Sequence, residues 1–154
     1  MDVKARPYLR TPFSEAWGRF APEKNPRWIA YQSDESGRYE VYVDTFPERR
    51  RKTPISVGGG WYPAWGPGGR ELYYISPDFK LMAVSVKLGN DIAEPSAPRE
   101  LFRLPIANPD FMPFEPALDG KRFLVRATPQ QAVPEPLILI VNWTALLKRG
   151  AAEP

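Results

Sequence analysis

The side chains that carry most enzyme chemistry are missing from this 154-residue chain, which contains no histidine and no cysteine. Without histidine there can be no Ser-His-Asp triad, no imidazole acid or base, and no histidine-ligated metal. Without cysteine there can be no thiol nucleophile, no cysteine-ligated zinc, no iron–sulfur cluster and no disulfide. The remaining candidates are a few carboxylates, a glycine-rich segment, a basic run and a set of aromatic residues.

The carboxylates of Asp34, Glu35 and Asp78 fall in two turns that occupy equivalent places in the sequence. Paired carboxylates hydrolyse glycosides only when a cleft holds them at a controlled separation and raises the pKa of one of them. Adjacent acids in an exposed turn satisfy neither condition, so we interpret these residues as turn formers. We therefore predict no catalytic residue, no cofactor and no metal site.

Two further segments have a binding and a structural interpretation. Gly58-Gly59-Gly60 resembles a phosphate loop in composition, but it lacks a following Lys-Ser/Thr and leads into an expected strand instead of a helix. We predict that it connects two sheets. The basic run 48–52 (Glu-Arg-Arg-Arg-Lys) has no accompanying aromatic stacking pattern, which favours a solvated loop over an anion or nucleic-acid contact.

Large apolar side chains precede or begin three expected strands and form the candidate interaction surface of this chain. On a rigid scaffold such side chains serve as binding anchors, and between neighbouring sheets they serve as packing. The packing interpretation is favoured, and the binding interpretation stays open. The residues are Phe13, Trp17, Trp61, Tyr62, Phe111, Met112 and Phe114.

Composition decides which elements can position these residues. Nineteen prolines exclude a helix bundle or a coiled coil, because proline removes a backbone donor and fixes φ. Twenty aromatic residues favour strands. No apolar run reaches the roughly 18 residues of a membrane span, and residues 1–20 lack the apolar middle of a signal peptide. A net charge of +3 with both signs interspersed does not indicate nucleic-acid binding.

A unit of turn and strand recurs along the chain. The turn 65–70 (Trp-Gly-Pro-Gly-Gly-Arg) leads into an alternating apolar segment, and Pro116–Lys121 does the same further on. The segment Leu72–Tyr74 aligns with Phe123–Val125 and, upstream, with Ile29–Tyr31, where the turn is two residues longer. Repeats of about 40–50 residues that contain four short antiparallel strands are typical of propeller blades.

The repeat predicts an all-β chain of about three four-stranded antiparallel blades in one domain, 1–154. The second and third strands of each unit are expected at 29–33 and 39–43, at 72–76 and 81–86, and at 123–127 and 137–141. Fourth strands are expected at 53–57 and 100–104.

The blades are expected at about 16–57, 61–105 and 112–143. Residues 5–10 form a spare outer strand in this prediction, and 143–149 a short C-terminal helix. Three blades make a partial ring or half of a six-bladed ring, because known propellers have about four to eight blades.

The turn 65–70 resembles the W-S-P-D-G-R turn of TolB-type, WD-repeat-like β-propellers, and 117–121 resembles it more loosely. The segments 27–43 and 141–147 are similar to the last blades of propellers attached to bacterial serine/threonine protein kinases. This resemblance implies a non-catalytic module for protein interaction or sensing, belonging to a larger TolB-like or kinase-linked bacterial protein. It also implies an extracytoplasmic, periplasmic position, on which the residues themselves do not decide.

Two partners and one alternative function follow from this interpretation. Each blade has two apolar faces, so the outward faces of a three-blade block require further blades or a second copy that completes a ring. The alternative is an accessory propeller that gates a prolyl-oligopeptidase-type hydrolase whose catalytic domain lies elsewhere. A kinase domain upstream or a G-x-S-x-G serine downstream would discriminate between the two.

Overall fold

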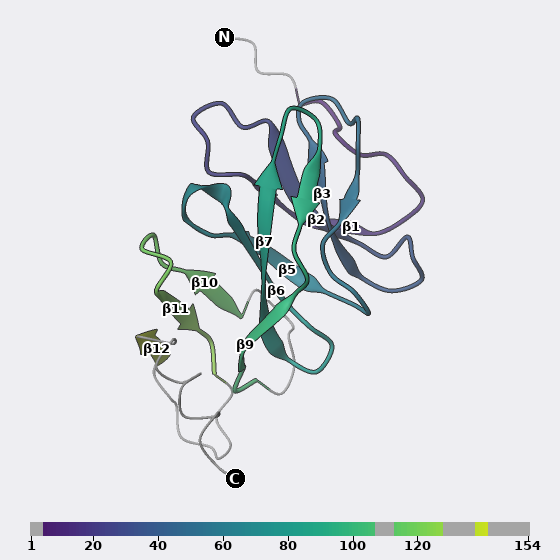
Figure 1. Ribbon diagram of the computed structural model, residues 1–154. Coiled ribbons are helices and arrows are strands. Elements are labelled where there is room, and N and C mark those ends of the chain that lie inside the picture. Colours follow the sequence, from purple (N-terminus) through teal and green to yellow (C-terminus); the bar gives the residue numbers. More distant parts are fainter. Residues whose placement is uncertain (1–4, 107–112, 128–137, 142–154) are drawn as a thin grey trace.

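The computed structural model describes residues 5–106, 113–127 and 138–141, and it is all-β. Apart from one 3₁₀ turn, η1 (Pro67–Gly69), the regular structure in these ranges consists of strands in three antiparallel sheets that follow one another along the chain. In Figure 1 the first sheet lies at the upper right, the second in the centre and the third at the lower left. The described part of the chain holds no helix with the length and apolar character that a membrane crossing requires.

The first sheet has four antiparallel strands in chain order, as predicted, but its fourth strand ends at Pro54 instead of residue 57. Its strands are β1 (Glu15–Phe20), β2 (Trp28–Ser33), β3 (Glu40–Thr45) and β4 (Thr53–Pro54). All six residues of β2 and of β3 are buried, because both of these central strands have neighbours on either side and cover on both faces.

The second sheet has five strands instead of the predicted four. Its strands are β5 (Trp61–Trp65), β6 (Glu71–Ile75), β7 (Lys80–Leu88), β8 (Ala93–Pro95) and β9 (Arg99–Arg103). The nine-residue β7 is long enough to pair with β9 through its first half and with β8 through its second half. The outer position of this sheet is therefore divided between two short strands, of which the sequence predicted only β9.

The third sheet comprises β10 (Phe114–Pro116), β11 (Arg122–Val125) and β12 (Ile138–Val141) in chain order. β11 and β12 match the strands predicted at 123–127 and 137–141. The predicted C-terminal helix, 143–149, lies outside the described residues.

The three units share the backbone hydrogen bond that closes the turn between their first and second strands. The donor and acceptor are Ala21 N and Trp28 O in the first unit, Gly66 N and Glu71 O in the second, and Ala117 N and Arg122 O in the third, at 2.8–3.0 Å. These atoms occupy identical places in the sequence alignment of the units. The repeat detected in the sequence is therefore also a repeat of backbone structure.

Two apolar seams join the sheets face to face. The first seam places Trp28, Ala30, Val41 and Val43 of the first sheet against one face of the second, with Leu72, Tyr74, Val84 and Val86. The second seam places Tyr73, Ile75, Leu81, Ala83 and Leu101, on the other face of the second sheet, against Phe114, Phe123 and Val125 of the third. Because successive residues of a strand point to opposite faces, the alternating apolar residues of β6 supply both seams.

The sequence predicted that the outward face of the first sheet would be exposed, but chain from the N-terminal region lies on it. The sequence also predicted a strand at residues 5–10, and these residues form none. They are irregular chain on the outward side of this sheet, where the Tyr8 hydroxyl donates to the Thr45 carbonyl at 2.7 Å. Pro7 has no N–H to donate to a ladder, and the segment is tied down through side chains. The predicted spare strand is therefore wrong.

Candidate interaction surface

Two of the candidate aromatic residues occupy the same irregularity in equivalent strands. Trp17 lies in a β-bulge of β1 and Tyr62 in a β-bulge of β5, with φ of +57° and +55°. Positive φ is costly for a bulky residue and persists only where the surroundings enforce it. The two rings meet edge to face with centroids 4.9 Å apart, so the strained residues contact each other across the first two sheets.

Polar contacts hold this junction in place. The Tyr62 backbone N–H donates to the side-chain oxygen of buried Gln32 at 2.9 Å. Nearby, the Trp65 indole N–H donates to the Arg19 carbonyl at 3.0 Å. Both bonds run between the first and second sheets, and together with the contact of Trp17 and Tyr62 they pack the two sheets together.

The other candidate residues divide between core and surface. Phe114 is buried and its ring lies 6.4 Å from that of Phe123 in the second seam. Trp61 is half-buried and packs on the same seam, whereas Phe13 remains 45% exposed. Phe111 and Met112 lie outside the described residues. Among the described members of the set, Phe13 and the exposed parts of Trp17 and Trp61 are accessible to a partner.

The glycine-rich segment connects β4 to β5 and needs its glycines for close approach. Gly59 has a φ of +118°, and a Cβ there would lie 2.5 Å from Cγ of Pro77. A Cβ on Gly60 would lie 2.6 Å from Cβ of Ser56. The segment therefore connects two sheets, as predicted, and its glycines serve packing.

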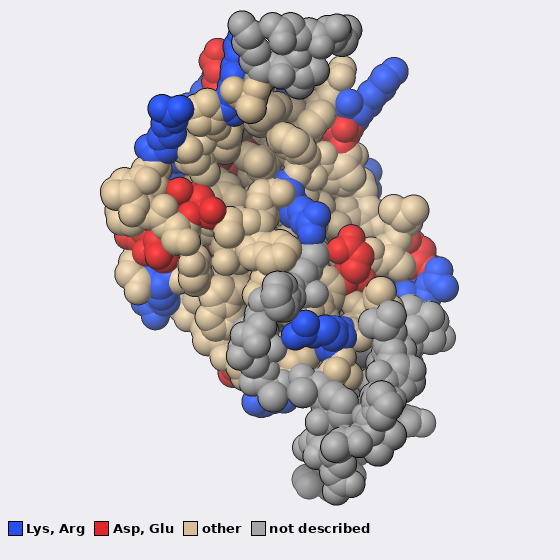
Figure 2. Space-filling model, turned by 180° about the vertical axis from the view of Figure 1, so that it is seen from behind, with Lys and Arg blue, Asp and Glu red and all other residues tan. Residues whose placement is uncertain are grey.

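The basic run is the loop between β3 and β4, and most of its charges are paired. Arg49 Nε lies 3.0 Å from Asp44 Oδ2, and Arg50 lies 3.2 Å from Asp91. Lys52 pairs with Glu35 and lies 4.8 Å from the centre of the Tyr42 ring. Figure 2 shows that Lys and Arg do not gather into one patch on the face that it presents. Nucleic-acid binding finds no support in this arrangement.

The turn acids both accept hydrogen bonds, Asp78 from within its own turn and Asp34 from a residue 20 positions before it. Asp34 accepts from the Ser14 backbone N–H at 2.8 Å, and Asp78 accepts from the Ser76 hydroxyl at 2.6 Å. This bond and Lys80 hold the pKa of the Asp78 carboxyl below its usual value. Asp78 therefore stabilises its own turn, as predicted, whereas Asp34 ties its turn to the segment that precedes β1.

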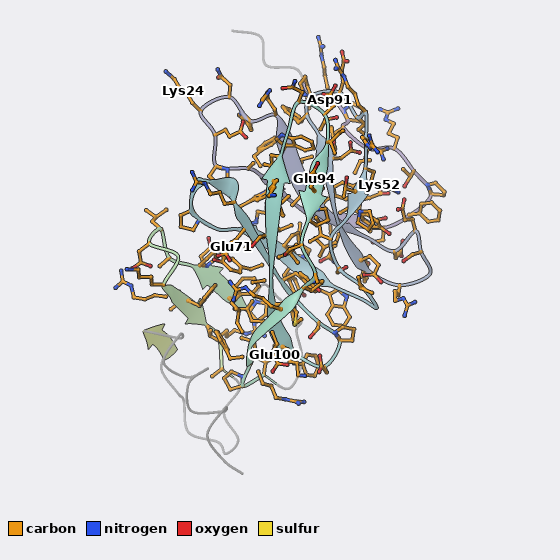
Figure 3. All side chains as sticks on the ribbon, in the orientation of Figure 1. Lys24, Lys52, Glu71, Asp91, Glu94 and Glu100 are labelled. Atoms are coloured by element: carbon orange, nitrogen blue, oxygen red, sulfur yellow. The ribbon has the colours of Figure 1, made fainter. Side chains whose placement is uncertain are left out.

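Other acids are dispersed over the molecule. In Figure 3 the labelled Glu71, Asp91 and Glu100 lie well apart from one another, so they do not converge on a common site. No group of metal-ligating side chains occurs among the described residues. Three hollows on the described surface are open, have volumes of about 370–550 Å³, and are each lined by both acidic and basic residues.

A polar cluster on the outward face of the first sheet escaped the sequence analysis. Asp44 is 1% exposed and interacts with Tyr8, Tyr31 and Arg49. Burial, followed by the Asp44 carboxylate, raises the pKa of the Tyr8 hydroxyl well above its ordinary value. The available signal was Asp44 itself, a charged residue directly after the apolar Val43, because a charge that is buried beside such a residue requires a partner.

A scan against protein-family models, a search of curated proteins and a search of solved structures found no match to this chain.

Proposed function

We propose that this chain is a non-catalytic segment of a β-propeller that serves protein–protein interaction or sensing, as part of a larger TolB-like or kinase-linked bacterial protein. It uses a stack of three blade-like sheets as a rigid scaffold. The partner is a protein surface, further blades or a second copy, and it meets the outward face of the third sheet.

One observation carries this proposal: the same contact joins both pairs of successive sheets. Gly69 of the second unit approaches Pro22 of the first, and Gly120 of the third approaches Pro67 of the second. Both glycines have left-handed φ, +67° and +65°, and both prolines hold the same place in their turns. A step that repeats between neighbours generates an arc of sheets, which is how propellers are built.

The chemistry of the described residues supports binding over catalysis. Their acids are dispersed or engaged in turns, and the ion pairs on their surface balance charge locally. Aromatic side chains on rigid strands are suited to partner recognition.

The third sheet offers the test of this proposal. Phe123 and Val125 point into the second seam, so Leu124 between them points away from it and is 40% exposed. Leu124→Asp places a charge on the outward face of the third sheet. Leu118→Asp is the matched control, because Leu118 is 97% exposed in the preceding turn.

We expect the 154-residue chain to self-associate in sedimentation velocity and light scattering. Leu124→Asp should weaken that association at least about tenfold, because a desolvated charge costs more than 1.4 kcal/mol. Leu118→Asp should leave it unchanged. A wild-type chain that stays a stable, non-aggregating monomer would contradict the proposal.

A further inference from the structure

A short piece of chain crosses the outward face of the first sheet from one end to the other. At one end the Tyr8 hydroxyl reaches the carbonyl of Thr45, the last residue of β3, and its ring lies 5.7 Å from Phe46. At the other end Ser14 donates its N–H to Asp34 and accepts from the Tyr39 hydroxyl, both at 2.8 Å. Tyr39 directly precedes β3, so residues 8–14, which we call the strap, run along this strand.

The two faces of the first sheet differ in chemistry. The face in the seam carries Trp28, Ala30, Val41 and Val43, which are all apolar. The alternating residues on the strap side include Tyr31, Tyr42 and Asp44, which are buried but carry hydroxyl and carboxylate groups. Terminal units of stacked proteins have a polar outer face, whereas internal units have two apolar ones.

We infer that the strap is an end cap, which occupies the face where a further sheet would stack and closes this end of the molecule to other sheets. The inference rests on the contacts of residues 8–14 and not on the proposed function. Of the two outward sheet faces in the described part of the chain, a second copy could then approach the one on the third sheet. Head-to-tail closure of a ring from two copies would require the strap to open.

The anchors of the strap set the size of the expected effects. A hydrogen bond such as Tyr8 to Thr45 contributes about 0.5–1.5 kcal/mol net, which is roughly a twofold to tenfold change in an opening equilibrium. The Tyr8 ring adds its contact with Phe46. Removal of the hydroxyl and the ring together should therefore free the strap more than removal of the hydroxyl alone.

Trypsin cleavage after Arg10 measures how often the strap opens, because Arg10 lies between the anchors and is followed by Thr11. We expect Tyr8→Ala to accelerate this cleavage about tenfold or more, and Tyr8→Phe about twofold to tenfold. Phe20→Ala is the matched control: the Phe20 ring packs on the same Phe46 ring, at 4.7 Å, but does not belong to the strap.

Cleavage within the sheets, such as after Lys80, reports global unfolding. Its rate is subtracted from the cleavage rate at Arg10. If Tyr8→Ala unfolds the chain, Tyr8→Phe still tests the anchor. Equal rates at Arg10 for Tyr8→Ala, Phe20→Ala and the wild type would overturn the inference, as would a wild-type rate equal to that of a free peptide of residues 5–14.

Sedimentation velocity of the Leu124→Asp chain tests the closure itself, because any association through the third sheet is then suppressed. Adding Tyr8→Ala should produce a new, concentration-dependent association through the uncovered first sheet. If the double variant sediments like Leu124→Asp alone, the strap is not what closes this face. That result would not bear on the proposed function, because the proposed function is tested by comparing the self-association of Leu124→Asp with that of the wild type.

Discussion

Single residues with a left-handed backbone conformation show where packing contacts compensate for local strain. The turn between β2 and β3 places Gly37 at a left-handed position, where its N–H donates to Asp34 O. The turn between β6 and β7 uses the same bond, from Phe79 N to Ser76 O, with Phe79 at a φ of +61°. Phe79 also packs on the second seam. The aromatic contact thus offsets the cost of a left-handed phenylalanine, of about 1–2 kcal/mol.

Gly37 and Gly59 separate strain from steric conflict, and this gives a prediction. Both have positive φ, but a Cβ on Gly37 would meet no atom within 4 Å, whereas one on Gly59 would collide with Pro77. We expect Gly37→Ala to lower the free energy of unfolding by about 1 kcal/mol through backbone strain alone. Gly59→Ala should lower it by a further 1–3 kcal/mol through overpacking.

Urea denaturation followed by tryptophan fluorescence measures both variants against the wild type. Equal losses for the two alanines would show that the segment between the first and second sheets can relax away from Pro77. That outcome would contradict the close approach on which our structural account of Gly59 rests.

At the scale of elements, serine side chains extend the ladders where the outer strands are too short. After the two-residue β4, the hydroxyl of buried Ser56 accepts from the Val41 N–H at 2.8 Å. Between β8 and β9, the hydroxyl of Ser96 accepts from the Ser85 N–H at 3.1 Å, in an exposed position. The two serines make the same bond in different surroundings.

The paired substitutions Ser56→Ala and Ser96→Ala therefore test the role of burial. Ser56→Ala removes the acceptor of a buried N–H, which costs about 1–3 kcal/mol of unfolding free energy. Ser96→Ala should change it by less than about 0.5 kcal/mol, because water replaces the hydroxyl. Thermal and urea unfolding give both values, and a loss for Ser96→Ala as large as that for Ser56→Ala would refute this account.

Strands could be predicted from the sequence where a local pattern of residues determines them. Alternating apolar residues and turn chemistry located β2, β6 and β11, since both signals lie within a few residues. β8 was missed because three residues, Ala93–Pro95, carry no period and pair only because β7 overruns β9. The strap was missed for a similar reason. Its position follows from hydrogen bonds to residues as far as 37 positions away, as from Tyr8 to Thr45, which no local pattern reports.

The candidate surface shows the same division between local and long-range information. Aromatic residues were found by type, but type does not distinguish Phe114, which is buried in a seam, from exposed Phe13. That distinction depends on how the sheets stack. From the sequence we could predict only that most of these aromatic residues would be used in packing, and not which ones.

At the scale of the whole molecule, the described sheets form a stack in which the two apolar seams lie between successive sheets, and Trp17 is a residue of the first sheet that also packs on the second seam. The first and third sheets have separate seams on opposite faces of the second. In such an array, stability is a sum of units and interfaces, so damage to one interface should remain local. Phe123 is the residue with which to test this, because it is fully buried and its ring lies 5.0 Å from Tyr73 and 5.8 Å from Phe102.

Phe123→Ala should cost about 3–5 kcal/mol in the second seam and release the third sheet. We expect hydrogen exchange to accelerate in β10 and β11, while β2 and β3 keep their protection, because the first seam contains none of the altered contacts. Val43→Ala, in the first seam, is the control and should accelerate exchange in β2 and β3 while leaving β11 protected. Uniform acceleration in both variants would mean that the three sheets unfold as one cooperative unit, and the description of the molecule as an array of separable sheets would then be wrong.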